Sequence, residues 1–353
     1  MCYVGQKRQD ISWRVKRHFE LLKVSNFYGD NMPNWINGKA IYSINGIYPA
    51  IKEIMIAVYV GTYTTAIQGM KKNKNDADEV KPCYLDMTAG TGVIKLTHNN
   101  SNYFIFGSAT IGLLAPTYFQ KKLRQRKTIY PFYKAIFIEN DRDRSIILRK
   151  IINDVCKRLQ ELNLPCPKRQ VISKDANVVA YDVIDKHKDC DHWLVVIDPE
   201  GMEISWKTLK ALLNTQKVDV IFNYMCAGIR RQLRHACRAE DHAFHQFFGN
   251  EEWRLLCNND NEDRVGEKLH EIYIKSIGEL GYYVKTASVF RNRLFDWHYH
   301  LDVIVKKEDP PWLRGFEEYR KFLEDLGEDG LVNILLGKTL IDYVYPTHTN
   351  TFR

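Results

Sequence analysis

Four acidic residues follow apolar runs in this sequence, at positions where they could bind a ligand. They are Asp86 after "KPCYL", Glu139 after "YKAIFI", Asp175 after "RQVISK" and Asp198 after "HWLVVI". Apolar runs of this kind predict strands that are covered on both faces of a parallel sheet. Ligands of such sheets bind beyond the carboxyl ends of the strands. We therefore expect the four acids to line one crevice.

The first acid leads into the small-residue turn "DMTAGTG". Gly90 and Gly92 permit positive φ, and they let a ligand approach backbone N–H groups at the start of a following helix. Lys95 stands where a dinucleotide motif has its third glycine, which disfavours NAD, and no Gly-Lys-Ser/Thr follows as in a P-loop. Asp86 suits the amino and carboxylate groups of a methionine moiety, through water or backbone. The turn therefore predicts S-adenosylmethionine (SAM).

The other acids have chemical roles that fit an adenosine-bearing ligand. Glu139 can accept hydrogen bonds from both ribose hydroxyls, and Asp175 can accept from an adenine amino group or lie beside it. Asp198 can accept a proton or hydrogen bond from a reacting nitrogen or hydroxyl, or it can simply cap the next helix. Glu200 can act similarly or face water. We expect Asn223 with Tyr224, after the next strand, to line the pocket or to make strand-end hydrogen bonds.

The elements that must position these residues alternate along the chain. Helices are expected at 47–70, 141–162, 177–188, 205–216 and 263–281, and strands at the runs already quoted and at 218–224, 282–291 and 299–307. Strands separated by helices predict an α/β fold with a doubly wound, mostly parallel sheet. The last two strands have no helix between them, which predicts an antiparallel hairpin at one edge of a seven-stranded sheet. We divide the chain into an N-terminal helical region (1–80), an α/β domain (81–307) and a C-terminal helical extension (308–353).

Composition narrows the class of protein. Hydrophobic residues make up 45% and charged residues 27% of the 353 residues, as in ordinary globular proteins. No run of eighteen apolar residues predicts a membrane span, and the N-terminus lacks a secretory pattern, so we expect a cytoplasmic protein without membrane contact. The eight cysteines form no Cys-x-x-Cys pair and have no histidines at zinc spacing, which predicts reduced, mostly buried thiols and no metal site.

The charge balance favours a polyanionic partner. The formal net charge is +8, and basic residues cluster at 121–127, 148–160 and 228–238. Such clusters predict contact with RNA or DNA, although they also occur on solvated helix faces. Arg230, Arg231 and Arg234 are candidate contacts to phosphates.

Several motifs in order carry a resemblance to a known family. "YLDMTAGTG", "FGSA", "FIEND", "KDAN", "VVIDPEGMEISWKTL", "VDVIFNYMCAGIRRQL" and "FFGNEEW" resemble the three-Cys-motif partner (TcmP) family across residues 47–307. Its members are similar to class I, Rossmann-like SAM-dependent methyltransferases. The resemblance implies a partner protein, and it implies a SAM pocket formed by Asp86, Ala89, Gly90, Gly92, Glu139, Asp175 and Ala176. It further implies that Asp198, Pro199 and Gly201 line the reactive mouth.

Two departures from the methyltransferase pattern matter. Glu139 lies 47 residues beyond Gly92, where about 20 are usual, so we expect inserted helices between them. The reactive motif reads Asp-Pro-Glu-Gly rather than the Asn/Asp-Pro-Pro-Tyr of enzymes that methylate exocyclic amines. No aromatic residue follows Pro199 directly to stack on a flipped base.

Three functional hypotheses follow. The first is a SAM-dependent methyltransferase that acts on a nucleic-acid or nucleotide-containing substrate, with Asp198, Pro199 and Glu200 at the reacting end. The second is a non-catalytic SAM-binding partner module with the same fold. The third, a metal-dependent nuclease that uses Asp86, Glu139 and Asp198, leaves the glycine turn without a role.

Overall fold

The computed structural model describes most of the α/β region and parts of the N-terminal region. The described residues are 21–28, 41–45, 48–67, 79–98, 100–120, 129, 131–238, 242–259, 264–292, 296–308, 313, 323 and 325. The expected C-terminal helical extension and the basic cluster at 121–127 lie outside these ranges almost entirely. The division into three regions stays a prediction.

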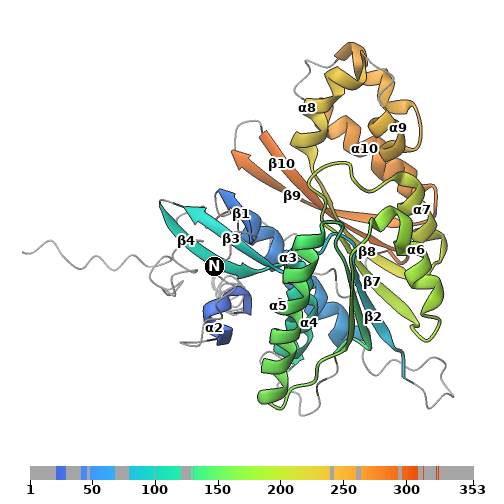
Figure 1. Ribbon diagram of the computed structural model, residues 1–353. Helices are drawn as coiled ribbons and strands as arrows, with labels where there is room; N and C mark the ends of the chain where they lie inside the picture. The colour runs from blue at the N-terminus through green and yellow to red at the C-terminus, as the bar shows by residue number, and fades with distance from the viewer. Residues whose placement is uncertain are drawn as a thin grey trace, which may run out of the picture.

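A seven-stranded, mostly parallel sheet forms the centre of the molecule (Figure 1). Its strands, in spatial order, are β6 (Lys168–Ile172), β5 (Lys134–Ile138), β2 (Pro82–Asp86), β7 (His192–Ile197), β8 (Val218–Tyr224), β10 (Asp296–Val305) and β9 (Tyr283–Asn292). β10 is antiparallel to both of its neighbours, and the other pairings are parallel. The predicted fold class is confirmed: this is a doubly wound, Rossmann-like sheet of seven strands, mostly parallel, with an antiparallel hairpin at one edge.

Helices cover both faces of this sheet, because the sheet residues are apolar on both sides. On one face, the core joins the sheet to α3 (Tyr48–Ile67), α4 (Ser108–Tyr118) and α5 (Arg142–Glu161). On the other face, it joins α6 (Ala176–Lys186), α7 (Trp206–Asn214), α8 (Cys226–Ala236), α9 (His242–Phe248), η3 (Glu252–Asn259) and α10 (Val265–Gly278). The helices expected from the sequence at 47–70, 141–162, 177–188, 205–216 and 263–281 are all present. Asp141 caps α5 by accepting a hydrogen bond from the Arg144 amide.

A second, smaller sheet contains the strands that lie between the glycine turn and α4 along the chain. It consists of β1 (Tyr42–Asn45), β3 (Val93–His98) and β4 (Ser101–Phe106), with β1 parallel to β3 and β3 antiparallel to β4. The expectation that a helix follows Gly92 directly is wrong, because β3 begins at the next residue. The long spacing between Gly92 and Glu139 is therefore filled by a hairpin and α4, rather than by helices alone.

Six cysteines are paired as disulfides, so the expectation of reduced thiols is wrong for them. The pairs are Cys83–Cys190, Cys156–Cys166 and Cys237–Cys257, and Cys226 is buried and free. Disulfides are more typical of oxidising compartments than of the cytosol of mesophiles, so a cytoplasmic location stays a prediction. No helix in the described part of the chain is long and apolar enough to cross a membrane.

Candidate functional site

A cavity of about 660 Å³ opens at the carboxyl ends of β2, β5, β6 and β7. Its wall contains most of the residues predicted for the cofactor and for the reacting end. These are Ala89, Gly90, Gly92, Glu139, Asp175, Ala176, Asp198, Pro199 and Glu200. The prediction that strand ends far apart in the sequence share one crevice is confirmed for Glu139, Asp175 and Asp198.

The glycine turn forms one wall of the cavity and is fixed to α4. Gly90 and Gly92 have φ values of 55° and 77°, which strongly favour glycine. A Cβ atom at Gly92 would lie 2.9 Å from Thr110 Oγ1. That hydroxyl donates to the Gly92 carbonyl at 2.7 Å, and the Gly107 amide donates to the same carbonyl at 3.0 Å. α4, whose first residue is Ser108, therefore starts at the cavity beside the glycine turn.

Asp86 lies beneath this turn and is not part of the cavity wall. Its Oδ1 accepts a hydrogen bond from the Thr88 amide at 3.1 Å. Burial raises the pKa of Asp86 to about 7, although hydrogen bonds from Ser108 and Thr88 oppose the shift. Asp86 therefore shapes the turn from below, and its carboxylate is held in an environment that favours the protonated form.

Two of the predicted acids occupy the part of the wall formed by β5 and β6. Glu139 Oε1 accepts from the Asp141 amide at 2.8 Å, which fixes the side chain at the end of β5. Asp175 is the N-cap of α6 and accepts from the Asn177 amide at 2.8 Å. Both residues line the cavity.

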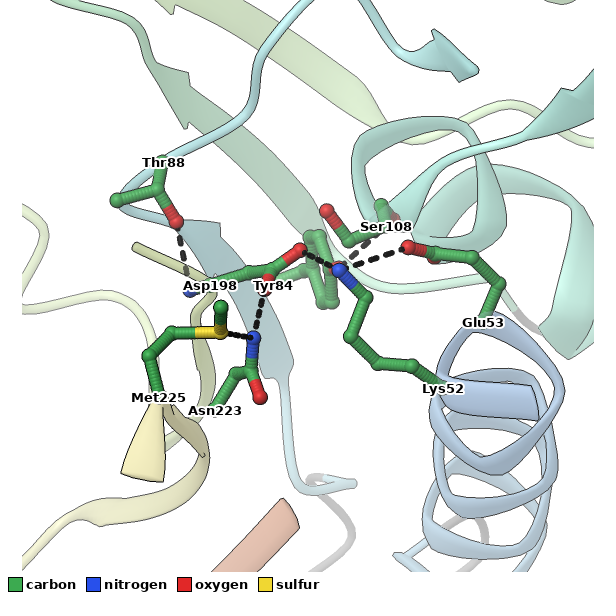
Figure 2. A network of polar contacts seen from close by, with 8 residues as sticks. All are labelled: Lys52, Glu53, Tyr84, Thr88, Ser108, Asp198, Asn223 and Met225. Carbon is green, nitrogen blue, oxygen red and sulfur yellow. Dashed lines mark hydrogen bonds and ion pairs between the residues drawn. The ribbon is translucent and has the colours of Figure 1, made fainter. Parts of the chain in front are cut away.

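Asp198 is the centre of a polar network at the other end of the cavity (Figure 2). Its Oδ2 accepts from the Lys52 ammonium at 2.5 Å, and its Oδ1 accepts from Asn223 Nδ2 at 2.7 Å. Its backbone amide donates to Thr88 Oγ1 at 2.7 Å. Asp198 is therefore fixed by β2, β8 and α3 together, and both of its carboxylate oxygens have partners.

Lys52 and Glu53 are functional candidates that the sequence analysis missed. Both come from the second turn of α3 and line the cavity (Figure 2). Burial by itself lowers the pKa of Lys52, but the charges of Asp198 and Glu53 outweigh burial and raise it above its ordinary value. Burial raises the pKa of Glu53, and the charges of Asp198 and Asp86 add to that shift against the opposing effect of Lys52. The sequence did carry a signal for them: Lys52 and Glu53 are two adjacent charged residues within a largely apolar helix. Charged residues are rarely buried unless they are paired or functional.

The remaining predicted residues lie outside the cavity. Tyr224 points to the opposite face of the sheet, where its ring packs against His270 and Phe247. Asn223 contacts Asp198 but does not line the wall. Arg230, Arg231 and Arg234 lie on α8, with Arg231 and Arg234 exposed.

Two residues of the cavity wall, Arg144 and Glu200, form an exposed ion pair. Arg144 Nη1 lies 3.2 Å from Glu200 Oε1, and both side chains are well exposed to solvent. This pair joins the start of α5 to the Asp-Pro-Glu-Gly loop after β7. The predicted catalytic role of Glu200 stays a prediction, because its carboxylate already has this partner at the surface.

The acids of the cavity do not form a metal site. Within the described ranges, no three His, Cys, Asp or Glu side chains are arranged to hold a metal ion. The nuclease hypothesis therefore has no support from the geometry of Asp86, Glu139 and Asp198.

Solved structures similar to this chain were compared with it by fold. A Legionella pneumophila protein, LPL1258, matches with a TM-score of 0.43 and 12% identity over 81% of this chain and 94% of its own. Trm1 of Pyrococcus horikoshii, solved in complex with S-adenosyl-L-methionine, matches with a TM-score of 0.37 and 12% identity over 72% of this chain and 54% of its own. A putative RNA methyltransferase of the same organism, PH1948, matches with a TM-score of 0.31 and 11% identity over 72% of this chain and 82% of its own. No family model and no curated protein matches the sequence. All three TM-scores are below 0.5.

Proposed function

We propose that the protein is a SAM-dependent methyltransferase acting on a nucleic-acid or nucleotide-containing substrate. One observation carries the proposal: the glycine turn, Glu139, Asp175 and Asp198 come from four separate strand ends and border one cavity. A volume of about 660 Å³ lies in the range of small-molecule and cofactor sites. Membership of the TcmP family is part of this proposal and rests on the ordered motifs alone.

The residues present fit this cofactor. The backbone of the glycine turn leaves room for a ligand because no side chain projects from Gly90. Glu139 stands where a ribose would be bound, and Asp175 with Ala176 stands beside the place of the adenine. When bound, SAM supplies an activated methyl group, so the protein must orient the acceptor and exclude water rather than activate the donor.

Asp198 is the residue at the reacting end that is best suited to position an acceptor. Its two oxygens are held by Lys52 and Asn223, so the carboxylate has a fixed direction. An acceptor N–H or O–H can share one of these oxygens as it enters. Asp198 then acts by hydrogen bonding and charge, with the ammonium of Lys52 opposite its Oδ2.

The basic helix α8 supports a polyanionic substrate. Arg231 and Arg234 project from its exposed face, and α8 directly follows β8, whose Asn223 contacts Asp198. We propose that these arginines contact phosphates. The alternative, a SAM-binding partner module without turnover, is favoured by the missing aromatic residue after Pro199.

Calorimetric titration with SAM tests the proposal first. We expect saturable binding to the wild-type chain and weaker binding to a Gly92→Ala variant. Incubation with methyl-labelled SAM and pools of RNA, DNA and protein then separates the two readings. Labelled product supports the enzyme, binding without any product supports the partner module, and absence of binding at millimolar SAM refutes both.

A further inference from the structure

Glu53 is a buried carboxylate in the wall of the cavity. Its side chain is about 1% exposed, and neither carboxylate oxygen has a hydrogen-bond partner among the described residues. Lys52 Nζ lies 3.5 Å from Oε1, which is an ion-pair distance rather than a strong hydrogen bond. Buried carboxylates normally have partners, so this one is placed to receive something from outside the chain.

The charges around Glu53 indicate which kind of group it binds. At this end of the cavity, the described residues include three neighbouring carboxylates, those of Glu53, Asp86 and Asp198, and one ammonium, that of Lys52. The ammonium lies 1 Å closer to Asp198 than to Glu53. A second positive charge next to Glu53 would reduce this excess of acidic groups over the single ammonium, and a buried carboxylate gains most from a charged hydrogen-bond donor.

We propose that Glu53 is the ammonium-binding residue of this pocket and accepts hydrogen bonds from the amino group of the amino-acid part of the cofactor. The identity of the ligand rests on the proposed function, whereas the position of the subsite rests on the geometry of Glu53. Asp86, which the sequence suggested for this role, is fully buried and is not part of the cavity wall. The N-terminal helix α3 therefore supplies a cofactor-binding residue and is part of the functional unit.

A cycle that removes the charge from either partner tests this assignment. The ligands are S-adenosylhomocysteine and its deaminated analogue, which has hydrogen in place of the ammonium. The variants are Glu53→Gln, which keeps the shape of the side chain, and Glu203→Gln. Glu203 is a matched control because its carboxylate also lines the cavity but is exposed and accepts a hydrogen bond from the Gly201 amide.

We expect wild-type protein to bind S-adenosylhomocysteine roughly tenfold to 100-fold more tightly than the deaminated analogue, as for a charge-assisted hydrogen bond. Glu53→Gln should lose this discrimination and bind the analogue as wild type does, within about twofold. Glu203→Gln should keep the discrimination. If Glu53→Gln weakens both ligands equally, or weakens neither, the assignment is wrong.

A second measurement uses only the wild-type chain and so does not depend on how the variant folds. Titrations near pH 7 in buffers of different ionisation enthalpy report the protons released on binding. S-adenosylhomocysteine should release more protons than its analogue, because an ammonium beside Glu53 favours the ionised carboxylate. Equal release by the two ligands would overturn the assignment. If neither ligand binds wild-type protein, the proposed function itself fails and this assignment fails with it.

Discussion

Replacing Lys52 by methionine should strongly destabilise the protein, because it leaves Asp198 without its ion-pair partner. At 2.5 Å and an effective dielectric constant of about 20, the attraction between the two charges is about 7 kcal/mol before desolvation is subtracted. Removing one partner of a buried pair costs about 3–5 kcal/mol. Asp198 keeps Asn223 as a donor and its side chain is 16% exposed, so we expect a loss near the lower limit, about 3 kcal/mol.

Adding Asp198→Asn to the Lys52→Met variant should restore most of this loss. The asparagine is neutral and can still accept the hydrogen bond from Asn223, so no unpaired charge remains at that position. Glu53, the other ion-pair partner of Lys52, loses the charge that opposes the effect of burial on its pKa, so it becomes a neutral acid rather than an unpaired charge. We therefore expect the double variant to lie within about 1 kcal/mol of wild type. A loss of 3 kcal/mol in a chain of this length corresponds to a decrease in Tm of about 4 °C.

Urea unfolding followed by tryptophan fluorescence measures these differences, with calorimetry as a second method. Lys186→Met is the matched control. Lys186 Nζ lies 3.9 Å from Asp182 Oδ2, and both side chains are more than half exposed, so its loss should stay within about 0.5 kcal/mol. The reasoning is refuted if Lys52→Met loses less than about 1 kcal/mol, or if the double variant is as unstable as the single one.

Two further predictions concern the turn. The folded-state pKa of Asp86, about 7, lies above its ordinary value of 3.8, so the stability that Asp86 contributes is fully present below pH 4 and is lost as the pH rises through 7. Asp86→Asn should therefore lose less stability than wild type between pH 5 and pH 8 in urea titrations, and identical losses would contradict this. Gly92→Ala should cost more stability than Gly90→Ala, about 2–3 against about 1 kcal/mol. Both residues have positive φ, but only a Cβ at Gly92 would contact Thr110 Oγ1; equal losses would show that the contact relaxes freely.

The seven-stranded sheet could be predicted from the sequence because its strands are short apolar runs separated by amphipathic helices. The α5 segment shows why this works. Its buried residues recur at helical spacing, as in Leu148, Ile151, Ile152 and Val155, and its N-cap Asp141 directly precedes the first residue of the helix. The carboxyl ends of parallel strands lie at the same edge of a sheet. The sequence alone therefore predicted that these strand ends lie close together.

The small sheet was missed although its pattern was present. Residues 93–97 have a composition typical of a strand, with Val93, Ile94 and Thr97 β-branched, and Asn100, at φ 60°, supplies the turn before Ser101. The expectation of a helix after the glycine turn came from the usual architecture of nucleotide-binding folds. The long spacing to Glu139 showed that something was inserted, but spacing alone does not distinguish a hairpin from a helix.

Tertiary partners were beyond the reach of the sequence pattern. Lys52 and Asp198 are 146 residues apart, and nothing local indicates that they meet. The same holds for Cys83 and Cys190, which are 107 residues apart. In contrast, the wrong prediction that Tyr224 lines the pocket could have been avoided, since adjacent residues of a strand face opposite sides of the sheet. Asn223 and Tyr224 could not both point to the same site.

The burial of α3 has a consequence for how the chain folds during synthesis. Nearly all of its described side chains are covered, and its main helical neighbour is α4. A nascent chain releases α3 from the ribosome well before residues 108–118, and long before Asp198. During that interval the helix has an apolar surface with nothing native to cover it, so this segment is where we expect chaperones to bind as the protein is made.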